Sequence, residues 1–287
     1  MHLLRRSPRA CGIPRSRWRL RDLLACCPWL RLGTLRGLGR LLQRLGIAGK
    51  RGQDYVHSPD PDYPAKLEVV AALRLAAQVV PAHHQVLFLD EMTVYRQPTL
   101  ATAWAERGAG QPRAVRSHAS NTATRILGAL DAVSGELHSL RTVKVTVPRL
   151  VTFFGHLVAA APAGSRLWIV LDNWPVHWHP DLLVALEPQV TAFPGHTPGH
   201  WPTTASEAAR RKWGHLRLPI QLVPLPTYAS WCNPIEQVWR KLRQELGHLH
   251  PWAQALPQLR TELDAWLASY QRPAPDLLHY VGLRPAQ

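Results

Sequence analysis

The chain has 287 residues, a formal net charge of +15 and 46% hydrophobic residues. This length allows one large domain and one small domain, and the composition excludes a mostly disordered chain. No apolar run approaches the ~20 residues needed to span a bilayer, and the basic start lacks the apolar stretch of a secretory signal. Cys11, Cys26, Cys27 and Cys232 form neither a C-x-x-C metal motif nor a disulfide framework, so we expect a cytoplasmic protein with no membrane partner.

The positive charge is concentrated at the start of the chain. Residues 1–53 hold twelve Arg and one Lys against the single acid Asp22, a net charge of 13 − 1 = +12, which leaves about +3 for the rest. A basic arm on a nearly neutral body is typical of a protein that binds a polyanion such as nucleic acid. The preference for Arg over Lys has a plainer explanation in codon bias, but codon bias does not explain the clustering.

Two short helices are predicted in this basic segment, over residues 17–27 and 35–45, with Thr34 as the N-cap of the second. One face of the second helix carries Leu35, Leu38, Leu42 and Leu45, and another carries Arg36, Arg40 and Arg44. Residues 1–53 therefore indicate a helix-turn-helix-like DNA-binding segment whose DNA-contacting residues are Arg36, Arg40, Arg44, Lys50 and Arg51. The alternative is a generic basic helical hairpin, and two glycines inside the second helix weaken the prediction by ~1 kcal/mol each.

A linker and a helix from about 65 to 80 are predicted to occupy residues 54–81. Residues 82–272 then alternate strands and helices, which indicates an α/β domain with a mixed central sheet flanked by helices. We predict strands at 86–89, 124–132, 136–145, 167–171 and 220–225, and helices around 150–158, 180–187, 234–246 and 255–270. Residues 191–217 are predicted to be a loop insertion, and residues 273–287 a C-terminal tail.

Three acids occupy corresponding positions in this pattern. Asp90 ends the first predicted strand of the domain, Asp172 ends the fourth, and Glu236 lies in the first turn of the helix after the last strand. Strand ends and helix starts at one edge of an α/β sheet converge in space. Carboxylates held close together repel one another unless cations lie between them, and Mg²⁺ or Mn²⁺ prefers such oxygen ligands. Two such ions ~3.5–4 Å apart promote in-line displacement at phosphorus.

Each acid also has a simpler explanation. Asp172 could start a turn before Pro175, Asp90 could be an isolated acid at a strand end, and Asn233 with Glu236 reads as a capping box around Pro234. Only the shared position of all three acids at one edge of the predicted sheet favours a functional site. Other acids are weaker candidates: Glu91 is expected on the opposite face of its strand from Asp90, Asp131 in a hairpin turn, and Asp181 and Glu187 on a helix surface.

Several motifs resemble one known family. Leu87-Phe88-Leu89-Asp90-Glu91, Leu171-Asp172-Asn173 with His177, Leu225-Pro226-Thr227-Tyr228-Ala229-Ser230, and Asn233-Pro234-Ile235-Glu236 with Trp239 resemble the bacterial insertion-sequence transposases of the mariner superfamily. The similarity covers roughly residues 85–250, and Trp104 and Gly108 also match positions where that family tends to have these residues. The box from Asn233 to Glu236 is the most specific of these motifs.

The resemblance implies an RNase H-like DDE endonuclease domain over residues 82–272. Asp90, Asp172 and Glu236 would be the catalytic metal ligands for two Mg²⁺ or Mn²⁺ ions. The implied reaction frees a 3′-hydroxyl at the ends of the element and transfers that strand to target DNA. The implied partners are the terminal inverted repeats and target DNA, bound by a homodimer on paired ends, which places the protein at the bacterial nucleoid.

Five further residues are assigned supporting roles. Asn173, His177 and Asn233 are interpreted as groups that support the metal ligands or contact DNA, and His177 could equally be a structural hydrogen-bonding residue. Arg240 and Arg243 follow Glu236 at i+4 and i+7, where they could contact phosphate, although a weak surface salt bridge between Glu236 and Arg240 is the commoner outcome.

Two departures from the family keep a second hypothesis open. Asp172 and Glu236 are 236 − 172 = 64 positions apart, more than in most relatives, with the excess in the loop at 191–217. The family usually has two helical DNA-binding units before the linker, whereas only about one is recognisable here, which implies a truncated start or reduced recognition of DNA ends. The alternative to an active transposase is therefore a catalytically inactive, transposon-derived DNA-binding protein or regulator.

Overall fold

The computed structural model describes residues 3–49, 57–108, 110–187 and 198–283. The chain divides into two compact units, Met1–Val56 and His57–Gln287, and each is described by itself. In the described residues, no helix has both the length and the apolar character needed to cross a membrane.

The first unit contains the two predicted helices, α1 (Leu20–Cys26) and α2 (Leu35–Arg44), which contact each other. The hydroxyl of Thr34 accepts a hydrogen bond from the backbone N–H of Gly37 at 3.1 Å, so the predicted N-cap is confirmed. The predicted leucine face is only partly buried: Leu38 is 2% exposed, whereas Leu45 is 57% exposed. The three arginines of the predicted stripe are exposed, namely Arg36, Arg40 and Arg44. Lys50 and Arg51 lie outside the described residues.

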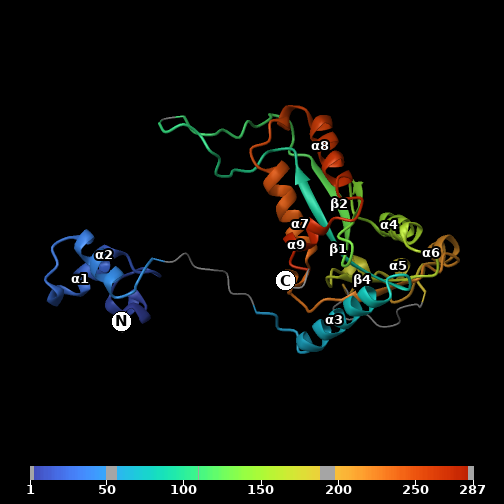
Figure 1. Ribbon diagram of the computed structural model, residues 1–287, viewed down its shortest axis with the longest axis horizontal. Coiled ribbons are helices and arrows are strands. Elements are labelled where there is room, and N and C mark those ends of the chain that lie inside the picture. Colours follow the sequence, from blue (N-terminus) through green and yellow to red (C-terminus); the bar gives the residue numbers. More distant parts are fainter. Residues whose placement is uncertain (1–2, 50–56, 109, 188–197, 284–287) are drawn as a thin grey trace. The chain divides into compact units, whose positions relative to one another are not determined.

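Within the described part of the second unit, five strands form one mixed sheet in the order β3-β2-β1-β4-β5 (Figure 1). The strands are β1 (His84–Tyr95), β2 (Ala123–Asp131), β3 (Leu137–Thr142), β4 (Arg166–Leu171) and β5 (Ile220–Pro224). β1 pairs with β4 and β4 with β5 in parallel, while β1 with β2 and β2 with β3 are antiparallel. The predicted α/β class with a mixed central sheet is confirmed.

Helices cover both faces of this sheet. Alternation along β1 sends Val86 and Phe88 to one face and Leu87 and Leu89 to the other, and all four are buried. The first face packs against α3, α7, α8 and α9, and the second against α4 and α5, with α4 opposite α7 and α8 in Figure 1. The helices are α3 (Tyr63–Val79), α4 (Val147–Ala160), α5 (Pro180–Leu183), α6 (Glu207–Trp213), α7 (Ile235–Leu242), α8 (Leu256–Ala268) and α9 (Pro275–Tyr280).

The structure corrects three of the predicted elements. The helix expected over 180–187 is only the short α5. The region 191–217 contains a helix, α6, whose N-cap Ser206 accepts a hydrogen bond from Ala209 N at 3.2 Å. The helix expected over 234–246 is α7, which ends at Leu242 and continues as a π-helical turn through Gly247. The Pro, Gly and His content around α6 concealed the Ser-Glu helix start, which is a common N-terminal signal.

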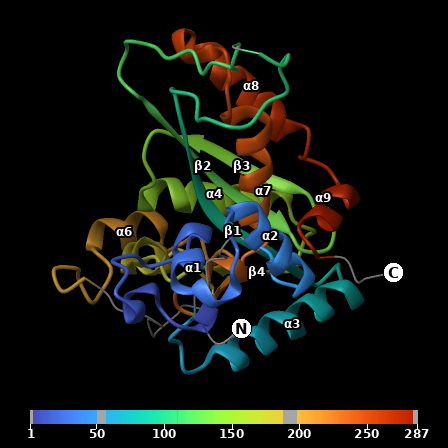
Figure 2. The same cartoon turned by 90° about the vertical axis from the view of Figure 1, so that its left-hand side faces the viewer.

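The residues after 272 are not a simple tail. Leu277, Leu278 and Leu283 are buried in the core, and α9 lies beside the sheet (Figure 2). The backbone N–H of Ala274 donates to Ser134 O at 2.9 Å, which joins this segment to the β2–β3 turn. Gly135 in that turn has φ +75°, and a Cβ there would lie 2.4 Å from the carbonyl oxygen of Ala274. The turn therefore requires glycine for its conformation and for this close approach.

We predict that Gly135→Ala lowers the free energy of unfolding by roughly 2–4 kcal/mol, because left-handed strain and overpacking against Ala274 combine. The matched control is Gly164→Ala, since Gly164 has φ +79° but nothing within 4 Å of a Cβ. The control should lose only about 1–2 kcal/mol. Urea denaturation followed by near-ultraviolet circular dichroism measures both losses, and equal losses would contradict the contact between Gly135 and Ala274.

Candidate active site

The strand pairing brings two of the predicted carboxylates to the same edge of the sheet. Phe88 of β1 lies beside Val170 of β4, and each strand reaches its acid two residues later, at Asp90 and Asp172. Asp90 does not end its strand as predicted, because β1 continues to Tyr95 paired with β2. Only the pairing with β4 ends at Phe88. The acids therefore lie where β1 and β4 separate, and Glu236 lies in the first turn of α7.

Trp239 of α7 holds the Asp90 side chain. Its indole Nε1–H donates to Asp90 Oδ2 at 3.0 Å, and Trp239 is 1% exposed. Gly128 of β2 lies opposite Asp90 in the sheet, and a Cβ at Gly128 would lie 2.4 Å from the indole ring. The missing side chain at 128 therefore makes room for the ring that orients Asp90. This contact also ties β1 to the helix that carries Glu236.

A buried histidine links the opposite face of β1 to Asp172. His177 is fully buried, its Nε2 bonds Glu91 Oε1 at 2.7 Å, and its Nδ1 lies 3.1 Å from Asp172 Oδ1. Burial by itself lowers the pKa of His177, but the charges of Glu91 and Asp172 and the hydrogen bond with Glu91 outweigh it and raise that pKa to about 10. His177 is therefore a cation between two carboxylates. Its burial excludes the predicted alternative of contact with DNA and fits support of Asp172.

Glu91 is a residue that the sequence interpretation undervalued. It does point away from Asp90, as the strand alternation predicts, but it thereby reaches His177. The neighbouring acids in the sequence were the available signal, since an Asp-Glu pair on one strand places a charge on each face. Among the other weak candidates, Asp131 accepts from Val133 N and Asp181 from Ser206 N, which are structural roles. Glu187 is exposed but lies beyond the end of α5, so its predicted place on a helix is wrong.

The three predicted carboxylates interact electrostatically. Burial, then the charges of Glu236, Glu91 and Asp172, raise the pKa of Asp90 to about 8. Burial also raises the pKa of Glu236, with Asp172 adding to the rise and Arg243 and Arg240 opposing it. Burial would raise the pKa of Asp172 as well, but the adjacent charge of His177 and the hydrogen bond from Trp174 N lower it. Burial and the neighbouring carboxylates thus disfavour the ionised form of Asp90.

The donor chemistry fits a hard divalent cation, although the ligands are not gathered as they stand. Three carboxylates supply only oxygen donors, and a cation among them would relieve the repulsion that raises the pKa of Asp90. As the side chains lie, no three His, Cys, Asp or Glu residues of the described chain could hold a metal ion together. Closure of the carboxylates around the cation would have to accompany binding.

The predicted supporting residues have distinct contacts. Asn233 is buried and its Nδ2 donates to Leu89 O at 3.0 Å, so the predicted capping box is wrong and the side chain instead joins α7 to β1. Asn173 Nδ2 donates to Leu225 O at 2.8 Å. Arg240 and Arg243 are exposed, and among the ion pairs of the described residues none joins Glu236 to Arg240. Both arginines remain available for an anionic ligand.

Comparison with known proteins agrees with this arrangement. Residues 85–259 match the family described as DDE superfamily endonuclease. The "Insertion element IS630 uncharacterized 39 kDa protein" of Shigella sonnei is 22% identical over 255 residues, which cover 86% of this chain. This chain spans 63% of that relative's length.

Solved structures of the Mos1 mariner transposase share the fold. The paired end complex with Mn has a TM-score of 0.55 at 15% identity, covering 95% of this chain and 76% of that one. The Mos1 strand transfer complex has a TM-score of 0.53 at 15% identity, covering 94% and 78%. The paired end complex with Mg has a TM-score of 0.52 at 14% identity, covering 94% and 79%. The predicted RNase H-like fold is confirmed.

We predict that Glu91→Gln lowers the free energy of unfolding by about 1–3 kcal/mol, because it removes one of the two charges that compensate a buried cation. The control is Asp264→Asn, which breaks the ion pair of Arg141 and Asp264, whose side chains are 37% and 47% exposed. That loss should stay below about 1 kcal/mol. Urea denaturation compares the free energies of unfolding of the two variants. Equal losses would show that the charge of Glu91 does not stabilise the buried His177.

Proposed function

The chain belongs to the DDE superfamily of endonucleases, and from this membership we propose that it is a transposase that cuts and joins DNA at the ends of an insertion sequence. The observation that carries the proposal is the placement of Asp90 and Asp172 where β1 and β4 separate, with Glu236 in the first turn of the helix whose Trp239 donates to Asp90. The insertion-element relative supports the substrate class, as do the Mos1 strand transfer complex and the Mos1 paired-end complex with the left transposon end.

Asp90, Asp172 and Glu236 are the residues that would hold Mg²⁺ or Mn²⁺, two ions in the proposal. When bound, the metal would supply activation of the attacking oxygen and stabilisation of the leaving oxygen at the scissile phosphate. The Mos1 paired end complexes with Mg and with Mn support this choice of cation.

The protein's own residues prepare this site. Trp239 fixes one oxygen of Asp90 through its indole N–H. The cationic His177 lowers the pKa of Asp172 and so keeps it ionised as an acceptor. Arg240 and Arg243 are exposed beyond Glu236 on the same helical run, where a DNA phosphate could pair with their guanidinium groups. The carboxylates and arginines together would address a substrate that is itself an anion.

In this proposal the first unit holds DNA through Arg36, Arg40 and Arg44, which are exposed on α2. Lys50 and Arg51 extend the basic sequence. The substrates are double-stranded DNA with terminal inverted repeats and a target duplex. Action as a homodimer on paired ends is proposed by analogy with the Mos1 paired end complexes.

We predict that the protein nicks DNA carrying the flanking sequence of its own gene in Mg²⁺ or Mn²⁺, and that chelation abolishes the nicking. Asp172→Ala should reduce it by more than about 100-fold, because even groups behind metal ligands contribute 10–100-fold. Asp181→Ala is the control, since Asp181 binds Ser206 outside the site. Salt-sensitive DNA binding without cleavage under either metal would instead support the inactive DNA-binding regulator.

We also predict that replacing Arg36, Arg40 and Arg44 together with Ala weakens DNA binding and its salt dependence. Each lost phosphate contact lowers the slope of log affinity against log salt by about 0.9, so the slope should fall by up to about 3. The matched control removes the same charge from exposed residues of α6, namely Arg210, Arg211 and Lys212. Fluorescence anisotropy at several salt concentrations measures both, and equal effects would contradict a specific role for α2.

A further inference from the structure

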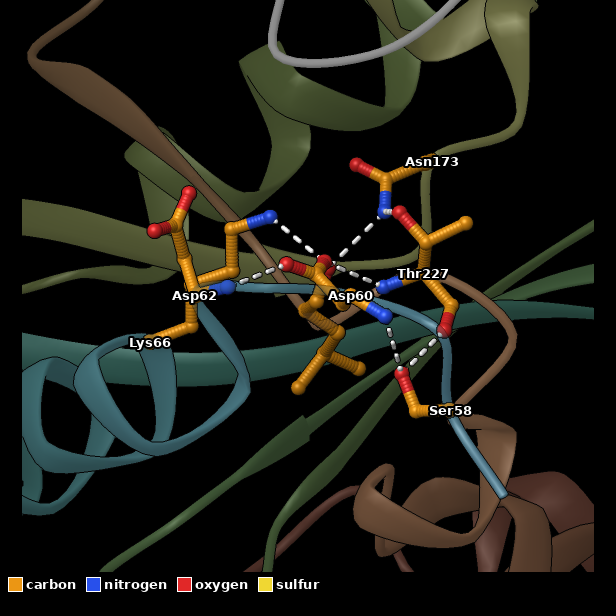
Figure 3. A network of polar contacts seen from close by, with 7 residues as sticks. Ser58, Asp60, Asp62, Lys66, Asn173 and Thr227 are labelled. Atoms are coloured by element: carbon orange, nitrogen blue, oxygen red, sulfur yellow. Dashed lines mark hydrogen bonds and ion pairs between the residues drawn. The ribbon is translucent and has the colours of Figure 1, made fainter. Parts of the chain in front are cut away.

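A polar network joins the start of the second unit to the loop that precedes α7. Residues 58–63 are here called the 58–63 segment, and residues 225–233 the 225–233 loop. Figure 3 shows Ser58 and Asp60 of the segment bonded to Thr227 of the loop. These two stretches are far apart in sequence, and neither contains a proposed metal ligand. The network therefore needs an explanation beyond the metal site itself.

Both backbone groups of Thr227 are held by this segment. Its N–H donates to Asp60 Oδ2 at 2.7 Å, and its carbonyl accepts from the Ser58 hydroxyl at 2.6 Å. The Asp60 side chain is 3% exposed, and it also accepts from Lys66 Nζ at 2.7 Å and from Asp62 N at 3.0 Å. With these donors on both oxygens, the Asp60 carboxylate is fixed in place.

The far end of the loop is fastened by the same segment. The hydroxyl of Tyr63, the first residue of α3, lies 3.2 Å from Cys232 Sγ and accepts from Trp231 Nε1 at 3.3 Å. The loop is therefore bonded to the 58–63 segment near its beginning and near its end. Asn233 and the α7 helix with Glu236 follow directly.

The loop in turn contacts residues that adjoin all three proposed ligands. Asn173, next to Asp172, donates to Leu225 O at 2.8 Å and lies 3.5 Å from Thr227 Oγ1. Asn233, three residues before Glu236, donates to the carbonyl of Leu89, which precedes Asp90. A shift of the loop would thus move the surroundings of each carboxylate.

The backbone conformation of Tyr228 agrees with a loop that is held in place by its hydrogen bonds at Thr227. Tyr228 has φ +54°, in the left-handed region that residues with a side chain rarely adopt. Its side chain is 78% exposed, so burial of the ring does not compensate this conformation. Such a residue persists where the surrounding structure fixes it, and here the fixed neighbour is Thr227.

We propose that Asp60, assisted by Ser58 and Tyr63, is a positioning residue that holds the 225–233 loop so that Asp172 and Glu236 converge on the metal. The expected effects on metal binding and on DNA nicking rest on the proposed function. It assigns to the segment before α3 a part in assembling the site, beyond its place as a linker. Asp60 touches neither substrate nor metal in this proposal and acts through Thr227 alone.

The test compares Asp60→Asn with Asp62→Asn in the full chain. Asp62 is exposed and enters the network only through its backbone N–H, so its variant removes the same charge two residues away. Asp60→Asn should weaken Mn²⁺ binding and reduce kcat for nicking by about 10-fold or more, with KM for DNA unchanged. Backbone amides of 225–233 and 171–178 should exchange hydrogen faster by mass spectrometry. Asp62→Asn should match the wild type in every measurement.

The outcomes are distinguishable from failure of the proposed function. If the wild type neither binds Mn²⁺ nor nicks DNA, the proposed function fails. Hydrogen exchange of the backbone amides of 225–233 and 171–178 then decides by itself whether Asp60 holds the loop. If Asp60→Asn loses its cooperative melting transition, the same measurements are made on Ser58→Ala, which removes the hydroxyl that donates to Thr227 O and accepts from Asp60 N. Unchanged exchange, or faster exchange with unchanged Mn²⁺ affinity and kcat, would overturn the proposal.

Discussion

The crowding of acidic side chains where β1 and β4 separate is the constraint on which the rest of the second unit depends. Burial and neighbouring carboxylates raise the pKa of Asp90, and within the described residues the buried His177 lies between two of the other acids, Glu91 and Asp172. Asp90 and Glu236 lack this partner, and their ionised forms stay disfavoured, as the raised pKa of each shows. In the proposed function, binding of a divalent cation would favour the ionised forms of both acids.

Core packing and the geometry of the proposed site depend on the same residues in this protein. The indole of Trp239 is a core side chain and also the hydrogen-bond donor to Asp90, and it lies there only because Gly128 has no side chain. Asn233 likewise ends the 225–233 loop and binds the strand that carries Asp90. Residues that would be described as structural from burial alone therefore set the geometry of the carboxylates, as is expected where outer groups orient metal ligands.

The division of charge between the two units matches a division of labour. The first unit carries most of the net positive charge and exposes its arginines on α2, whereas the second unit contains the acidic site. An acidic active site would repel a DNA backbone, and in the proposed function the separate basic unit would supply the attraction for DNA that the acidic site lacks. The exposed arginines after Glu236 would bring local positive charge to the same edge.

The sequence by itself determined the α/β class, the three carboxylates, the basic arm and the cap at Thr34, because periodicity, clustering and capping are local patterns. It did not determine that Asp90 lies within a longer strand, since the end of the β1–β4 pairing is a property of two strands. Only the tertiary structure decided that Glu91 reaches His177, that Asn233 binds Leu89 in place of a helix cap, and that Asp60 holds Thr227. The partners in these contacts are separated by 86, 144 and 167 positions. No local pattern encodes a contact over such a separation, because it forms only when the sheet and its covering helices have brought the two side chains together.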